Sequence, residues 1–159
     1  MLPARAADIE NVFLSVEPPR PVPPLVFEDE TGAQQALADY RGKFVLLNVW
    51  ATWCPPCAQE MPALDALQAH FDTRRLIVIP LSENSGDGIV SAFYRRRNIK
   101  NLPIAIDAAQ RAPAALSLRG LPASLLIDAS GNEVARAEGN IDWQSQKTLL
   151  FIHHKMGDN

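Results

Sequence analysis

Two cysteines, Cys54 and Cys57, stand where the pattern of this chain changes, and they constrain its fold more than any other feature. An apolar run, Phe44–Trp50, leads up to them, as is typical of a strand covered on both faces of a sheet. Behind them, apolar residues recur three or four positions apart, as on one face of a helix: Met61, Leu64, Leu67 and Phe71. The sequence therefore predicts a buried strand, then a turn, then a helix that begins at Cys54 and has Cys57 one turn inside.

A cysteine at the start of a helix has an environment that favours its thiolate. The first N–H groups of a helix have no partner within it, and the positive end of the helix dipole lies there. The thiolate is the form that attacks disulfides. Pro55 and Pro56 suit a first turn because those N–H groups would be unpaired anyway. They leave the Cys57 N–H as the nearest backbone donor to Cys54, so we expect modest stabilisation of the thiolate, which argues against a very strong oxidant.

Three interpretations of the cysteine pair are open from the residues. A C-x-x-C motif between a strand and a helix favours a redox dithiol. A zinc or copper site is an alternative, although a closed zinc site needs about four ligands and the motif supplies two. His153 and His154 lie far along the chain, on a predicted final helix whose C-terminal end favours cations. A purely structural disulfide is the third interpretation, but so short a loop gains little from closure.

The residues around the cysteines carry a family resemblance. Asn48 to Cys57, Asn-Val-Trp-Ala-Thr-Trp-Cys-Pro-Pro-Cys, followed by Glu60-Met61-Pro62, resembles the active-site stretch of the TlpA/ResA branch of thioredoxin-like proteins. The resemblance extends more loosely from about Pro24 to the final helix. It implies a bacterial thiol–disulfide oxidoreductase that works outside the cytoplasm, often as a membrane-tethered reductant in cytochrome c or cytochrome oxidase assembly. We predict no cofactor and no bound metal.

The predicted fold class is α/β. We expect a thioredoxin-like fold with a central mixed β-sheet flanked by helices, an N-terminal β extension and an extra β–α insertion. Strands are predicted over residues 25–27, 34–37, 44–50, 76–79, 103–106, 123–127 and 133–137. Helices are predicted from the cysteines to about residue 70, over 89–97 and 113–118, and from an Asp142 cap to about residue 156. A polar loop over 82–88 should lie on the cysteine side of the sheet.

The N-terminal part is expected to lie apart from this domain. Residues 1–16 are weakly patterned, and the proline-rich stretch over 18–24 reads as a stiff, extended tether. We therefore divide the chain into an extension and proline-rich tether over residues 1–23 and a thioredoxin-like domain over residues 24–159.

The predicted site combines the cysteines with a second proline element. Cys54 is expected to attack a partner disulfide, and Cys57 to resolve the mixed disulfide that results. Leu121-Pro122 stands where the resemblance places a cis-proline facing the cysteines, and the alternative is an ordinary trans proline that opens a strand. The residues expected to contact the substrate are Trp53, Pro55, Pro56, Leu121 and Pro122.

Proton transfer at the inner cysteine points to Glu60. Asn48 occupies the position where thioredoxin, which resembles this stretch, carries a buried aspartate, and an amide cannot ionise. Glu60 follows Cys57 by three residues, so the two are neighbours on the helix, and the resemblance also implies a functional glutamate here. If the site is partly desolvated, the pKa of Glu60 should be raised, which suits proton exchange near neutral pH. The alternative is a solvated surface glutamate.

Charge and hydropathy limit the class of partner. A net charge of −3 gives no reason to expect nucleic-acid binding. No run is long enough to span a membrane, and residues 1–11 lack the apolar core of a signal peptide. The resemblance implies instead a periplasmic or other extracytoplasmic location, with an anchor or export signal outside this sequence.

We therefore predict a monomeric protein disulfide reductase. Its partners would be protein disulfide or dithiol substrates and an upstream thiol–disulfide electron donor. The alternatives are an oxidase or isomerase of protein thiols, and a copper- or zinc-binding assembly factor.

Overall fold

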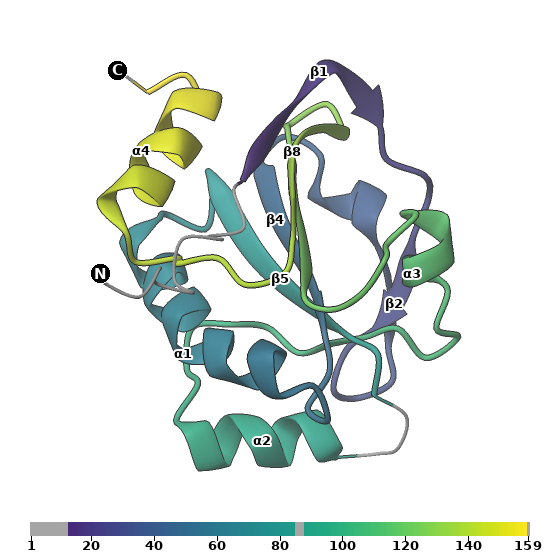
Figure 1. Cartoon of the computed structure of the whole chain (residues 1–159). Helices are drawn as coiled ribbons and strands as arrows, with labels where there is room; N and C mark the ends of the chain where they lie inside the picture. Colours follow the sequence, from purple (N-terminus) through teal and green to yellow (C-terminus); the bar gives the residue numbers. More distant parts are fainter. Residues whose placement is uncertain (1–12, 85–87, 159) are drawn as a thin grey trace, which may run out of the picture.

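The strand that leads to the cysteines lies in the middle of an eight-stranded mixed sheet (Figure 1). The computed structural model describes residues 13–84 and 88–158. Its strands are β1 (Leu14–Pro21), β2 (Val26–Glu28), β3 (Gln34–Ala36), β4 (Phe44–Trp50), β5 (Leu76–Ser82), β6 (Ala105–Ile106), β7 (Ala123–Ile127) and β8 (Asn132–Glu138). Its helices are the 3-10 helix η1 (Leu37–Tyr40) and the α-helices α1 (Pro55–His70), α2 (Ile89–Arg97), α3 (Ala112–Ala115) and α4 (Gln146–Lys155). The predicted thioredoxin-like α/β architecture is confirmed.

The sheet order explains how distant segments meet. The strands run in the order β1-β8-β7-β4-β5-β6-β2-β3, with β4 parallel to β5 and antiparallel to β7. The carboxyl end of β4, which leads into Cys54, therefore lies beside the start of β7, where Val49 pairs with Ala123. This arrangement brings the segment before β7, with Leu121 and Pro122, next to the cysteines.

Alternation along β4 divides its side chains between two cores. Val45, Leu47 and Val49 belong to the core that contains residues of η1 and α3. Leu46 and Trp50 belong to the core that contains residues of α1, α2 and α4. Figure 1 accordingly shows α3 on the opposite side of the sheet from α1 and α4. Because successive strand residues alternate between faces, Asn48 faces α1.

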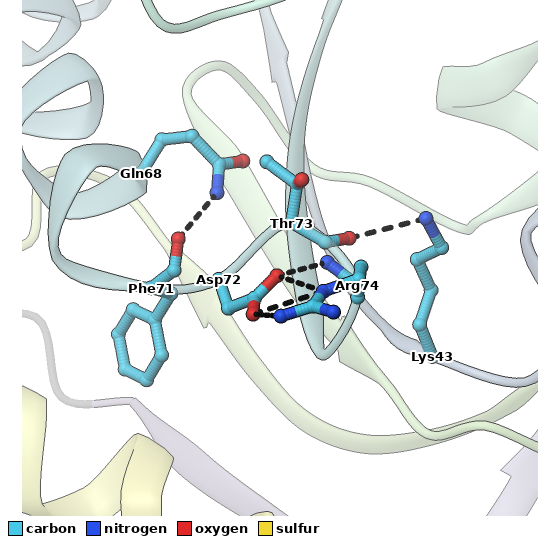
Figure 2. A network of polar contacts seen from close by, with 6 residues as sticks. All are labelled: Lys43, Gln68, Phe71, Asp72, Thr73 and Arg74. Atoms are coloured by element: carbon cyan, nitrogen blue, oxygen red, sulfur yellow. Dashed lines mark hydrogen bonds and ion pairs between the residues drawn. The ribbon is translucent and has the colours of Figure 1, made fainter.

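A buried glutamine ties the end of α1 to β5. The Gln68 side chain donates to the carbonyl groups of Phe71 and Leu76, and its Oε1 accepts the Val78 N–H at 2.7 Å. In the turn that follows, Asp72 accepts hydrogen bonds from the Arg74 backbone and guanidinium (Figure 2). These bonds fix the direction of α1 relative to the sheet and hence the place of its first turn.

The predicted tether is wrong for residues 18–21, because the structure pairs them as part of β1 with β8. Leu14 and Ser15 pair at one end and Arg20 and Pro21 at the other, with an irregularity between them. Prolines lack the N–H that a ladder needs, but an edge strand tolerates them. The loosely ordered segment predicted over 1–16 and the polar loop over 82–88 fall partly, at 1–12 and 85–87, outside the described residues.

The start of the last helix also differs from the prediction. The N-cap is Ser145, whose Oγ accepts the Thr148 N–H at 3.1 Å, and not Asp142. Asp142 instead accepts the Gln144 N–H in the preceding turn. Serine and aspartate cap helices about equally well, so local preference could not separate them. Among residues 13–84 and 88–158, no helix is long and apolar enough to cross a membrane.

Candidate active site

Cys54 and Cys57 form a disulfide at the N-terminus of α1. Cys54 is the N-cap residue, and Pro55 and Pro56 occupy the first two helical positions. Cys57 follows within the first turn. Cys54 is 7% exposed and Cys57 is 1% exposed, so Cys54 is the more accessible residue of the two. The predicted position of both cysteines at the helix start is confirmed.

The loop before Cys54 is held by a single asparagine. Asn84, just after β5, accepts the Thr52 N–H at 2.9 Å and donates to the Thr52 Oγ1 at 2.7 Å. Ser82 Oγ donates to the same Asn84 side chain at 2.8 Å. The next residue of the loop, Trp53, is 67% exposed, which agrees with the predicted exposure of this apolar side chain. The structure thus presents an indole to solvent beside Cys54.

The second predicted element lies against the outer sulfur. The Leu121–Pro122 peptide bond is cis, as predicted. The carbonyl oxygen of Leu121 lies 3.8 Å from Cys54 Sγ. Leu121 is half-buried and Pro122 is buried, and the Pro122 carbonyl accepts the Gly139 N–H at 2.7 Å. A backbone segment therefore borders the disulfide at Cys54.

Glu60 is buried on α1, one turn beyond Cys57. Only 5% of the residue is exposed, so it is not a solvated surface glutamate. Its Oε1 accepts the Ile141 N–H at 2.6 Å, whereas its Oε2 is buried without a hydrogen-bond partner among the described residues. Burial raises the pKa of Glu60 from 4.5 to about 7, against the opposing effect of the Ile141 N–H. The carboxyl group can therefore gain or lose a proton near neutral pH.

The segment that encloses Glu60 could not be predicted from the sequence. Residues 139–145 run from β8 to α4 past α1 (Figure 1). Within this segment, Asn140 Nδ2 donates to the Pro56 carbonyl at 2.9 Å and Trp143 is fully buried. Both side chains, and Asn48 from β4, favour the charged form of Glu60 more weakly than Ile141 does. No periodicity or motif marks this segment in the sequence.

Asn48 has the hydrogen-bond partner that a buried amide needs. It is 1% exposed, and its Nδ2 donates to Ser124 Oγ at 3.0 Å on the neighbouring strand β7. Its register partner on β7 is also Ser124. The amide is therefore fixed by the sheet and orients toward α1 without supplying an ionisable group.

A buried pair of carboxyl groups, Glu83 and Asp107, lies near the end of β5, and sequence reasoning missed it. Glu83 follows β5, and its N–H donates to the Trp50 carbonyl at 2.8 Å. No N–H or O–H group among the described residues donates a hydrogen bond to either carboxyl oxygen of Glu83. Asp107 accepts the N–H groups of Arg111 and Ala112 at the start of α3. Burial, with hydrogen bonding to Asp107 and its charge, raises the pKa of Glu83 to about 8.

Known proteins resemble this chain in sequence and in fold. Residues 18–136 match the AhpC/TSA family. The chain is 34% identical over 133 residues to the thiol-disulfide oxidoreductase ResA of Bacillus thuringiensis (strain Al Hakam), which covers 84% of this chain and 74% of that protein. A putative thiol:disulfide interchange protein DsbE from Chlorobium tepidum superimposes with a TM-score of 0.78 at 24% identity, covering 90% of this chain and 100% of that one.

A second solved structure shares the same fold. It is the exposed lipoprotein thioredoxin Etrx1 from Streptococcus pneumoniae strain TIGR4, with a TM-score of 0.69 at 23% identity. The similarity covers 84% of this chain and 99% of that one.

Proposed function

This chain belongs to the AhpC/TSA family and is a thiol–disulfide oxidoreductase of the ResA and DsbE kind. From that premise, we propose that it reduces disulfides of extracytoplasmic partner proteins. The observation that carries the proposal is the Cys54–Cys57 pair at the N-terminus of α1, with buried Glu60 one turn further along. In the reduced form, the pair holds the two electrons that a partner disulfide needs.

Cys54 is the attacking group. Its thiolate attacks one sulfur of the partner disulfide, a bond forms between Cys54 and that sulfur, and the partner's other sulfur leaves as a thiolate. Cys57 then attacks Cys54 Sγ, the mixed disulfide breaks, and the second partner thiol is released. Two electrons pass to the partner, and the Cys54–Cys57 disulfide is the oxidised product. The greater exposure of Cys54 supports these roles.

Glu60 accepts the proton that Cys57 loses as it attacks. The two residues are neighbours on α1, and a carboxylate whose pKa is about 7 is a suitable base near neutral pH. The buried Oε2 is the oxygen that remains to take the proton, because Oε1 already accepts the Ile141 N–H. Asn48 cannot serve as this base.

The partner binds around the outer sulfur. Trp53 offers an exposed apolar face, and Pro55 and Pro56 form the rim of the helix start. Leu121 and Pro122 offer backbone beside Cys54, where an extended partner segment can lie. Five residues of two chain segments would thus guide the partner disulfide to Cys54.

The direction of electron flow is that of a reductant. Pro55 and Pro56 remove two N–H groups from the first turn of α1, so the Cys54 thiolate has fewer donors to stabilise it. A reduced form that is weakly stabilised gives up its electrons readily. The reduced form of a strong oxidant is, in contrast, strongly stabilised.

The protein works outside the cytoplasm as a monomer tethered to the membrane by a segment beyond this sequence, and an upstream thiol–disulfide protein returns it to the dithiol. Cytochrome c or cytochrome oxidase assembly is the setting we favour. The resemblance to ResA and the fold shared with an exposed lipoprotein support this location.

Trapping of the reaction intermediate tests these roles. The Cys57→Ser protein, incubated with a disulfide-containing protein such as insulin, should accumulate a mixed disulfide at Cys54. Iodoacetamide should label Cys54 of the reduced wild type well before Cys57, because helix-start position and access govern thiolate reactivity. The matched Cys54→Ser variant should trap little. Preferential trapping or labelling at Cys57 would reverse the roles.

A further inference from the structure

Two buried carboxyl groups near the end of β5 take no part in the thiol chemistry described above. Glu83 is 4% exposed and Asp107, the residue after β6, is 3% exposed. The Asp107 N–H donates to the Ser82 carbonyl at 2.9 Å, and the carboxyl groups of Glu83 and Asp107 lie within hydrogen-bonding reach of each other. Two adjacent buried negative charges repel each other, so the folded protein favours a single charge on this pair.

The hydrogen bonds around the pair show which carboxyl group carries the proton. Asp107 Oδ1 accepts the Arg111 N–H at 3.1 Å and Oδ2 accepts the Ala112 N–H at 2.8 Å, and both bonds stabilise its negative charge. Glu83 accepts no such bond from the residues that the structure describes. A protonated Glu83 can donate to Asp107, and a hydrogen bond to a charged acceptor is a strong one. One proton on Glu83 therefore satisfies both carboxyl groups.

The surroundings of Glu83 provide no cation to offset a second negative charge. From β4, the Trp50 carbonyl accepts the Glu83 N–H at 2.8 Å. From the segment before α3, the neutral Gln110 side chain donates to the Glu83 carbonyl at 3.0 Å, and the Arg111 side chain is exposed. In the described part of the chain, no lysine, arginine or histidine forms an ion pair with either acid. Asp107 is therefore the charged group that governs the ionisation of Glu83.

The pair is connected to the active-site loop through the next residue of the chain. Asn84 follows Glu83 directly, and its side chain bonds both the N–H and the hydroxyl group of Thr52. Thr52 lies two residues before Cys54. Because Asp107 is fixed to the start of α3, repulsion within a doubly charged pair displaces Glu83, and Asn84 moves with it. The bonds to Thr52 are then weakened, and the loop before Cys54 loses its support.

We propose that Glu83 and Asp107 share one proton and that the protonated pair is a positioning element, which holds the loop over residues 51–54 in place for reaction at Cys54. When the proton leaves to solvent, the two carboxylates repel each other and the loop is released. The active site is thus held near neutral pH and loosened at alkaline pH. The consequence for partner reduction rests on the proposed function, whereas the movement of the loop does not.

Nuclear magnetic resonance of the oxidised protein tests the proposal without turnover. The active-site disulfide removes the titration of the thiols, and the amide of Thr52 and the side-chain amide of Asn84 report on the loop. Their chemical shifts should change with a midpoint near pH 8 in the wild type, where burial and Asp107 place the pKa of Glu83. The change should be absent in Glu83→Gln, because glutamine still donates to Asp107 but cannot ionise.

Two further variants identify the groups responsible. Asp107→Asn should move the midpoint to lower pH, because the repelling charge is removed. Glu60→Gln is the control: it removes the other carboxyl group that titrates near neutral pH, and it should leave the midpoint near pH 8. Circular dichroism checks that each variant is folded. A Thr52 amide that does not titrate in the wild type between pH 6 and 10, or that titrates equally in Glu83→Gln, would overturn the proposal.

A kinetic measurement tests the consequence for the reaction. Cys57→Ser and Cys57→Ser/Glu83→Gln proteins are each mixed with insulin at pH 9, where most cysteine thiols are ionised. The double variant should form the mixed disulfide faster, by up to about 10²-fold, because a small misplacement of a reacting group can cost that much. Equal rates would overturn the positioning role. Absence of trapping by both proteins would contradict the proposed function instead, and the resonance titration would still decide the proposal.

Discussion

Glu60 differs from an ordinary helix glutamate in its burial and in the single backbone N–H that it accepts. Its position could be predicted because it follows Cys57 by one turn. The contact with Ile141 could not, because 81 residues separate the two and no local pattern joins them. Glu83 and Asp107 were missed for the same reason: each is an isolated acidic residue in sequence, and only the sheet brings them together.

Replacement of Glu60 by glutamine should slow resolution of the mixed disulfide by about 10²-fold, because the amide cannot accept the Cys57 proton. In the wild type, the resolving step should speed up as pH rises through about 7, where Glu60 becomes ionised. Stopped-flow reaction of reduced protein with an aromatic disulfide reports this step as release of the second coloured thiol. The exposed Glu30→Gln variant is the control, and unchanged kinetics of Glu60→Gln from pH 5 to 9 would exclude the proton-transfer role.

Replacement of Glu83 by glutamine should make the fold less sensitive to alkaline pH. The pKa of Glu83 is about 8 when folded, so the native state binds more protons than the unfolded chain above pH 4.5. Stability from this group is full below about pH 4.5 and is lost as pH rises to about 8. Glutamine cannot ionise, so the loss between pH 5 and 9 should shrink by about 1–3 kcal/mol.

Urea unfolding of the oxidised protein at a series of pH values measures this difference. Glu60 has a raised pKa of the same sign, so the Glu83→Gln protein should keep part of the slope. Parallel stability curves for the variant and the wild type would contradict the assignment to Glu83.

At the scale of secondary structure, segments with a clear apolar pattern were predicted correctly, whereas β1 and the start of α4 were not. The observed β4 and α1 match the apolar run and the helical spacing that predicted them. β1 could not be predicted, because prolines in sequence argue against a strand and only the exposed edge of β8 makes room for them. The ion pair of Arg20 with Glu133, at 2.7 Å, further holds β1 on the sheet.

Replacement of Ser145 by alanine should destabilise the protein by about 0.5–2 kcal/mol, because the Thr148 N–H loses its side-chain acceptor. The Asp142→Ala control should cost less, since Asp142 accepts only the Gln144 N–H in an exposed turn. Thermal or urea unfolding measures both. A larger loss of stability in the Asp142→Ala variant would indicate that Asp142, rather than Ser145, caps α4.

At the scale of the whole molecule, the topology follows from the strand pattern, whereas the enclosure of the site does not. Parallel β4 and β5 with antiparallel β7 place the cysteines, Asn84 and the Leu121–Pro122 peptide at one edge of the sheet. The family resemblance predicted this arrangement. The segment over residues 139–145, which closes over Glu60, depends on tertiary contacts that no short stretch of sequence encodes.

The reduction potential of the Cys54–Cys57 pair tests the proposed direction of electron flow most directly. The protein is equilibrated in dithiothreitol buffers of known potential, and the fraction of dithiol is read by alkylation and mass. A reductant should give a value near that of thioredoxin, about −270 mV. A value near −120 mV, that of a strong oxidant, would contradict the proposed reductase and assign the pair to thiol oxidation.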